Sequence, residues 1–281
     1  MSIERAGQNV VLPSLGKPYN GLVPNGEVTV YTMKTTEEKL FAGLNKASDF
    51  ENVIDTLISR CTSIPKELKP SELYVGDRVF LMMNIRAVSY GIMYAFKASC
   101  SSCRAGWDHQ IDLTKDLEVK EVDSDWEDPF EIELPQSGDR VTLRLFRGRD
   151  ERRVIEFVDR SSRKVNLKSP GDPGYIYRMA LHVVGVMSTE AKNSFGGVGI
   201  DPADVLPPAL IWVENLSAMD SSAIREELEA RTPGILLSVE YDCPKCGTDL
   251  TEPLPVSPAF FRSTSSAKVR TTTRVLSPTG R

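Results

Sequence analysis

YAFKASCSSCRAGWDHQIDL (residues 94–113) and SVEYDCPKCGTDLTEPLPV (residues 238–256) share one local pattern. Each runs from a strand-like segment through a Cys-x-x-Cys turn and a small residue into a second strand-like segment. The two sulfur atoms of such a turn converge on one point, and two facing turns complete the tetrahedral four-sulfur shell that zinc favours. The sequence therefore predicts one structural zinc ion, bound by Cys100, Cys103, Cys243 and Cys246.

A glycine follows each cysteine pair, at Gly106 and Gly247. We expect both glycines to supply the positive φ angle that a tight turn needs.

Other chemistry stays open for these cysteines. A disulfide within or between the pairs is one alternative, although a Cys-x-x-Cys disulfide is strained and reducible. A thioredoxin-like redox pair opens a helix, whereas both pairs here lie between strands. An iron–sulfur cluster is a third alternative. A closed four-thiolate shell leaves no position for a water molecule, so we expect neither a catalytic metal nor an enzyme.

The two cysteine pairs lie far apart in the chain, with 139 residues between Cys103 and Cys243. Closing a longer loop costs only ~0.6 kcal/mol per doubling of its length, whereas a structural zinc ion contributes on the order of 10 kcal/mol. The intervening helices are therefore expected to form an insertion whose ends return to the β unit. We expect loss of the metal to unfold the β unit and much of this insertion together.

Composition limits the class of protein. The chain has 281 residues, of which 41% are hydrophobic, and this is enough for one or two domains. It carries 34 Lys and Arg against 39 Asp and Glu, a formal charge of -5, so no general attraction to nucleic acid or to an anionic membrane is expected. No stretch approaches the ~18 apolar residues of a transmembrane helix, and the first residues lack a secretion signal. We expect a protein made in a cytosol, with no membrane partner.

Cysteine usage agrees with a reducing compartment, because four of the five cysteines fall in the two pairs. Cys61 is left over and is expected to be a small core residue.

The pattern along the chain predicts an α+β fold with a small antiparallel, zinc-ribbon-like β unit built from the two distant cysteine pairs. Helical periodicity follows Thr35, Ser48 and Asp77, whereas alternation between residues 92 and 146 predicts strands. The expected order is an extended N-terminal arm over 1–30, a helical region over 31–91, the β unit with the first cysteine pair over 92–146, a helical insertion over 147–234, the second cysteine pair over 235–262, and a basic C-terminal tail over 263–281.

No motif of catalysis accompanies these elements. The sequence has no nucleophile elbow, P-loop or zincin motif, so no small-molecule substrate is expected. His109 lies beside the first cysteine pair and is either an outer-sphere partner of the metal or, as we expect, an ordinary surface histidine. His182 is expected to pack within a helix.

With these motifs placed, the chain resembles the baseplate proteins of T-even-type, contractile-tailed bacteriophages, of the baseplate hub or hub-assembly type. The most specific pieces are DRVFLMMNIRAVSYG (residues 77–91) ahead of the first cysteine pair and the doublet Phe260–Phe261 after the second. The resemblance covers about residues 30–262.

The resemblance implies a structural or assembly protein without catalytic activity, whose partners are other baseplate and tail proteins. It implies a location in the virion tail, and in the host cytoplasm during assembly. The arm and the tail match no part of the family pattern, which leaves both a permanent component and a transient chaperone open. Such segments are expected to be disordered alone and to fold on neighbouring subunits.

One alternative comes from another functional class. The cysteine turns and the basic tail are also features of a zinc-ribbon regulator that binds nucleic acid. The acidic balance and the lack of a basic-aromatic pattern argue against it, so nucleic acid is not an expected partner.

Overall fold

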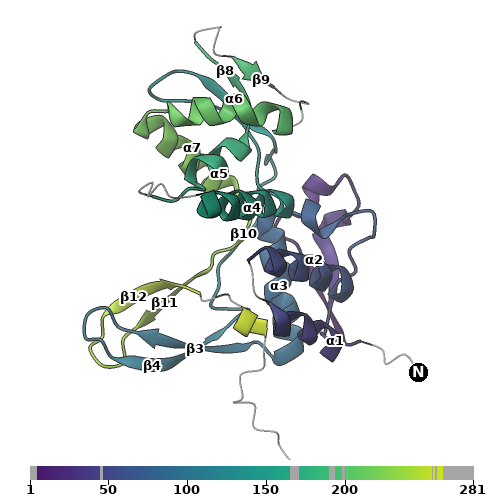
Figure 1. The fold of residues 1–281 in the computed structure, drawn as a ribbon. Helices are drawn as coiled ribbons and strands as arrows, with labels where there is room; N and C mark the ends of the chain where they lie inside the picture. Colours follow the sequence, from purple (N-terminus) through teal and green to yellow (C-terminus); the bar gives the residue numbers. More distant parts are fainter. Residues whose placement is uncertain are drawn as a thin grey trace, which may run out of the picture.

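The computed structural model describes residues 5–44, 47–164, 171–189, 194–197, 200, 202–254, 256 and 258–261. Within these residues the chain forms two lobes and two projecting hairpins, with a long helix, α4 (Gly148–Lys164), between the lobes (Figure 1). The mixed helices and antiparallel strands confirm the α+β class. The C-terminal tail predicted over 263–281 lies outside the described residues.

The first lobe is mainly helical. Its elements are β1 (Gly7–Val11), η1 (Lys17–Tyr19), η2 (Pro24–Gly26), β2 (Glu27–Tyr31), α1 (Thr35–Glu38), η3 (Lys39–Gly43), α2 (Ala47–Cys61), η4 (Pro70–Glu72) and α3 (Val75–Tyr90). In α2 the side chains of Ile54, Ile58 and Cys61 are almost fully buried, on the face that helical periodicity predicts. Cys61 is therefore a core residue, as expected.

The predicted extended N-terminal arm is wrong for the described part of residues 1–30. β1 and β2 form an antiparallel hairpin, and the connection between them buries Leu12, Tyr19 and Val23 in the core of the first lobe. The backbone N–H of Ser14 donates to Asp77 on α3 at 3.1 Å. The many prolines and glycines of this segment give no strand periodicity. The hairpin is stabilised by burial against α3, a distant part of the chain, which no local pattern predicts.

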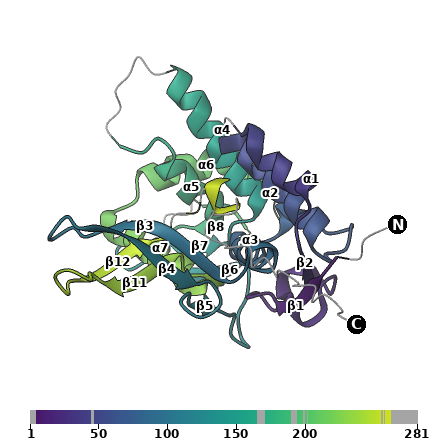
Figure 2. The ribbon, with the colours of Figure 1, turned by 90° about the horizontal axis from the view of Figure 1, so that it is seen from below.

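The two projecting hairpins carry the cysteine pairs. They consist of β3 (Met93–Ser99) with β4 (Gly106–Asp112), and β11 (Ser238–Asp242) with β12 (Asp249–Pro253). Figures 1 and 2 show the two hairpins side by side, pointing away from both lobes. We refer to them as the paired hairpins.

The second lobe combines one sheet with three helices. Its elements are β6 (Phe130–Glu133), β7 (Arg140–Leu143), α5 (Tyr175–His182), β8 (Val183–Met187), β9 (Phe195–Gly196), α6 (Pro202–Glu214) and α7 (Ala218–Arg231). The strands pair antiparallel in the order β6-β7-β8-β9.

This sheet corrects the expectation of one β unit over 92–146. β6 and β7 join β8, which comes from the predicted helical insertion, and they share a hydrophobic core with α5, α6 and α7 that is separate from the core of the first lobe. The predicted helical insertion includes the segment Val183–Met187. A short apolar run of this kind fits a buried strand and a buried helix equally well, so its pattern does not separate the two.

α6 forms although two consecutive prolines lie in its interior. The helix includes Pro207 and Pro208. Val205, Ala209 and Val213 are spaced four residues apart and are buried against the sheet. Burial of this face offsets the unfavourable prolines.

The chain returns from the second lobe along α3. β10 (Gly234–Ile235) pairs with β5 (Val119–Lys120), and Gly76 of α3 lies directly against Pro233. A Cβ atom at Gly76 would lie 1.7 Å from the Pro233 carbonyl oxygen, so only glycine fits here. This close approach brings the second cysteine pair back beside the first.

The described chain ends in η6 (Pro258–Phe261), which packs on the first lobe. Phe260 and Phe261 are fully buried, and Phe261 stacks on Phe41 at a ring distance of 4.6 Å. Phe260 meets the ring of Tyr94 on β3 at 4.8 Å. The doublet therefore joins the end of the second hairpin segment to the first lobe and to the base of the first hairpin.

Among the described helices, none combines the length and the hydrophobicity needed to cross a membrane.

A cluster of buried charges joins α4 to the first lobe. Arg78 is 2% exposed and pairs with Glu51 at 2.6 Å and with Asp55, which also pairs with Arg152 of α4 at 2.6 Å. Glu151 lies beside this cluster. Burial is the main cause that raises the pKa of Glu151 from 4.5 to about 7, and the negative charge of the nearby Glu51 is the second.

Replacement of Glu151 by glutamine is expected to stabilise the protein at neutral and higher pH. The folded state holds the Glu151 proton more tightly than the unfolded state, so the stabilising contribution is complete below about pH 4.5 and is lost as the pH rises through about 7. Thermal unfolding from pH 4.5 to 8 should therefore show Glu151→Gln gaining on the wild type as pH increases. Glu156→Gln, which changes an exposed position of the same helix, is the control. Parallel pH profiles for wild type and Glu151→Gln would contradict the expectation.

Candidate metal centre

The two cysteine turns have the same backbone geometry. In the first, the Cys100 N–H donates to the Ala105 carbonyl at 2.9 Å and the Arg104 N–H donates to the Cys100 carbonyl at 2.9 Å. In the second, the Cys243 N–H and the Thr248 carbonyl, and the Gly247 N–H and the Cys243 carbonyl, form the equivalent bonds at 2.9 Å each. The similarity of the two sequence segments thus extends to their hydrogen bonds.

The residue directly after each second cysteine takes the positive φ angle of the turn. These residues are Arg104, with φ 57°, and Gly247, with φ 69°. The prediction was therefore right for Gly247 and wrong for Gly106, which instead begins β4. The offset arises because Arg104 and Ala105 separate the first cysteine pair from its glycine, whereas Gly247 follows Cys246 directly.

The structure brings all four predicted cysteines together. Their sulfur atoms lie within 4.8 Å of one another, a group that could hold a metal ion. Across the two turns, the sulfur atoms of Cys100 and Cys246 lie 3.7 Å apart, and those of Cys103 and Cys243 lie 3.6 Å apart. A disulfide would require about 2.05 Å, so these are separate thiols.

The spacing of the sulfur atoms fits zinc. Four thiolates at a Zn–S distance of about 2.3 Å in a tetrahedron lie about 3.8 Å from one another. The observed approaches of 3.6 and 3.7 Å are close to this value. The Cys103 N–H also points at the Cys100 sulfur, at 3.4 Å, as expected where an amide stabilises a thiolate.

The thiols of Cys103 and Cys246 have pKa values that are shifted in opposite directions. The side chain and backbone of Thr248 lower the pKa of the Cys246 thiol to about 6, and the two side chains lie 3.1 Å apart. The Ala105 amide lowers the pKa of the Cys103 thiol, but desolvation and the neighbouring sulfur atoms outweigh it and raise that pKa to about 11. The neighbouring cysteines also lower the pKa of Cys246 but raise that of Cys103, so without a cation one thiolate forms readily and a second is opposed. A bound metal ion removes this conflict.

An aromatic cluster lies between the paired hairpins, near the cysteine turns in the sequence. Tyr241 of β11 lies 5.8 Å from the ring of Trp107 and 6.3 Å from that of Phe96, both on the first hairpin. These contacts join the paired hairpins through side chains as well as through the cysteines.

The histidines lie apart from the sulfur atoms. His109 is half-buried and its ring lies tilted against that of Tyr241, with 4.2 Å between the ring centres, so it belongs to the aromatic cluster. His182 ends α5, packs on Phe146 at 3.9 Å, and has its Nδ1 2.7 Å from the Arg144 carbonyl oxygen. Burial lowers the pKa of His182 to about 4. The expectation that His182 packs within the fold is confirmed.

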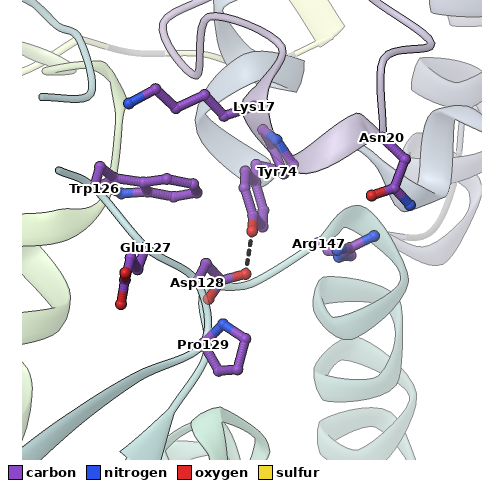
Figure 3. Close-up of a pocket in the computed structure, with 9 residues that line it drawn as sticks. Lys17, Asn20, Tyr74, Trp126, Glu127, Asp128, Pro129 and Arg147 are labelled. Atoms are coloured by element: carbon purple, nitrogen blue, oxygen red, sulfur yellow. Dashed lines mark hydrogen bonds between the residues drawn. The ribbon is translucent and has the colours of Figure 1, made fainter. Parts of the chain in front are cut away.

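A second feature was missed by the sequence analysis. A pocket of about 490 Å³ lies where the N-terminal hairpin, α3, α4 and the segment before β6 meet. Its lining residues include Lys17, Tyr74, Trp126 and Arg147 (Figure 3). No motif unites them, since they come from four separate parts of the chain.

Comparison with known proteins places the chain in one family. No curated protein and no solved structure matches it. The family described as "T4 bacteriophage base plate protein" matches residues 9–150, half of the chain, from the N-terminal hairpin through the first cysteine pair to the start of α4. This chain therefore belongs to the T4 bacteriophage base plate protein family.

Proposed function

We propose that this chain is a structural component of the baseplate of a contractile phage tail, in which a zinc ion makes the paired hairpins into a rigid arm for contacts with neighbouring proteins. Family membership supports the baseplate role. The four converging sulfur atoms are the single observation that supports the metal and the arm.

A metal clamp suits these hairpins physically. Each is an isolated two-stranded sheet, an arrangement that is marginally stable in water. The cysteine turns lie at the ends of the hairpins that point away from the lobes (Figure 1). A zinc ion bound by both turns would hold the two ends at one separation and orientation, which a surface for specific docking requires.

The proposed role is not catalytic, because four protein thiolates fill the tetrahedral coordination shell of zinc. The alternative regulator that binds nucleic acid gains no support. The segment between β4 and β7 exposes many more carboxylates than cations, unlike the basic surface that a phosphate backbone requires. These residues are Asp116, Glu118, Glu121, Asp123, Asp125, Glu127, Glu131 and Glu133.

Mass spectrometry of purified particles tests the proposed function. We expect this chain in the particles at a constant ratio to the other baseplate proteins, whatever the purification method. A transient chaperone would be found in infected-cell lysates and be absent from particles. The tail tube protein of the same particles serves as the internal standard. Absence of this chain from infectious particles would contradict a permanent structural role.

A further inference from the structure

The pocket between the lobes has a cation at each of two opposite sides. Lys17 lies on one side with Trp126, and Arg147 lies on the other with Asn20 (Figure 3). Between them stands Tyr74, whose hydroxyl donates a hydrogen bond to Asp128. The pocket volume of about 490 Å³ is in the range that holds a short peptide segment.

Among the described residues, neither cation has a carboxylate partner that it does not share. The Lys17 ammonium donates to two backbone carbonyls, those of Asp123 and Ser124, the latter at 3.1 Å, and no described carboxylate lies within ion-pair distance of it. Arg147 lies 3.6 Å from Glu72, but Glu72 pairs more closely with Arg149, at 2.7 Å. Both cations therefore retain charge and donors for a ligand.

The two carboxylates that line the pocket are either engaged by other donors or directed away from the cations. Asp128 already accepts hydrogen bonds from the Tyr74 hydroxyl and, at 2.8 Å, from the Leu145 N–H. Burial raises the pKa of Asp128, against the opposing effects of its hydrogen bonds and of the nearby Arg147. Glu127 is exposed, and its carboxylate points away from Lys17 and Arg147 (Figure 3).

The aromatic walls are held in place by other contacts. The Trp126 indole N–H donates to the Arg231 carbonyl at 2.9 Å, and the rings of Trp126 and Tyr74 meet edge to face at 5.8 Å. The Arg147 guanidinium lies over the Tyr74 ring at 5.4 Å. The pocket thus offers rigid apolar surface beside two available cations, and binding would cost little ordering of these walls.

We propose that this pocket binds an acidic peptide segment of a neighbouring baseplate protein, with carboxylates at Lys17 and Arg147 and apolar groups against Tyr74 and Trp126. Arg147 can form a two-point contact with a carboxylate, and Asn20 can add a hydrogen bond on the same side. The segment's carboxylates belong either to Asp and Glu side chains or to a chain terminus. This inference rests on the proposed baseplate role.

Zero-length cross-linking tests the pocket directly. A carbodiimide joins an amine to a carboxylate in contact with it as an amide, with loss of water and no added atoms. In purified particles, we expect Lys17 to be joined to an Asp, a Glu or a C-terminal carboxylate of another protein chain. Tandem mass spectrometry of the joined peptides identifies the chain and distinguishes a side chain from a terminus.

Lys17→Arg is the matched control, because it keeps the charge and removes the amine. Particles with this variant should lose the cross-link. If Lys17 is joined only to carboxylates of its own chain, or to none, the inference is overturned. Absence of the chain from particles would instead overturn the proposed function, so the two failures are distinguishable.

Charge reversal supplies an independent readout. Arg147→Glu and Lys17→Glu are each expected to lower incorporation into particles by about tenfold or more, as for loss of a charge-assisted contact. Arg160→Glu, at an exposed position of α4, should have no effect. Thermal unfolding of each purified variant shows whether it folds. If one of the two charge-reversal variants does not fold, the other still tests the inference. Folded variants that both enter particles at the wild-type level would overturn the inference.

Discussion

Replacement of Cys103 by serine is expected to abolish metal binding and to release the paired hairpins, while the second lobe stays folded. The wild type purified without chelator should contain close to one zinc ion per chain. Binding of structural zinc contributes on the order of 10 kcal/mol. Each hairpin is only two-stranded, so it depends on this contribution more than the lobes do.

The structure changes which region should respond to loss of the metal. Sequence spacing predicted that the segment between the cysteine pairs would unfold with the β unit. In the structure this segment has its own hydrophobic core, with fully buried Val141, Leu143 and Val183. Unfolding should therefore stop at the paired hairpins.

Elemental analysis and hydrogen exchange check this prediction. Amides of β3, β4, β11 and β12 should exchange on the order of a thousandfold faster in Cys103→Ser, whereas those of β7 and β8 should keep their protection. Cys61→Ser, which changes the cysteine outside the centre, should retain the zinc. Less than half an equivalent of zinc in the wild type, iron in its place, or hairpins still protected in chelator would each contradict the prediction.

Replacement of Phe261 by alanine is expected to destabilise the first lobe by ~3–5 kcal/mol, the usual cost of removing a fully buried phenylalanine. Phe261 is 0% exposed and contacts Phe41 and Phe260. The cavity left behind cannot close easily, because Phe41 is itself buried in the lobe. The change should also loosen the end of the second hairpin segment, which the doublet joins to the lobe.

Urea unfolding followed by circular dichroism measures this loss. Phe157→Ala is the matched control: Phe157 lies on α4, is half-buried and stacks on Tyr177 at 4.2 Å, so the cost there should be much smaller. Equal losses for the two variants would mean that the doublet is not an anchor. Zinc content should be unchanged in Phe261→Ala, because the four sulfur atoms lie at the other end of the hairpins.

The amino-acid sequence was sufficient for the features that depend on local spacing. The two Cys-x-x-Cys turns identified the four cysteines that the structure brings together, because a turn of this length constrains its own two sulfur atoms. Helical periodicity likewise identified α2 and α3, since one face of each helix must be apolar wherever the rest of the chain packs. The motifs ahead of the first pair also carried the family resemblance.

Only the tertiary structure decided which strands share a sheet and which distant residues meet. The strand patterns of β4 and β6 look alike in the sequence, yet β4 belongs to the paired hairpins and β6 to the second lobe. The pairing partner of a strand is determined by burial against elements elsewhere in the chain, so a local sequence pattern does not predict it. For the same reason the N-terminal hairpin and the pocket between Lys17 and Arg147 were not predictable, because both exist only where α3, α4 and the segment before β6 come together.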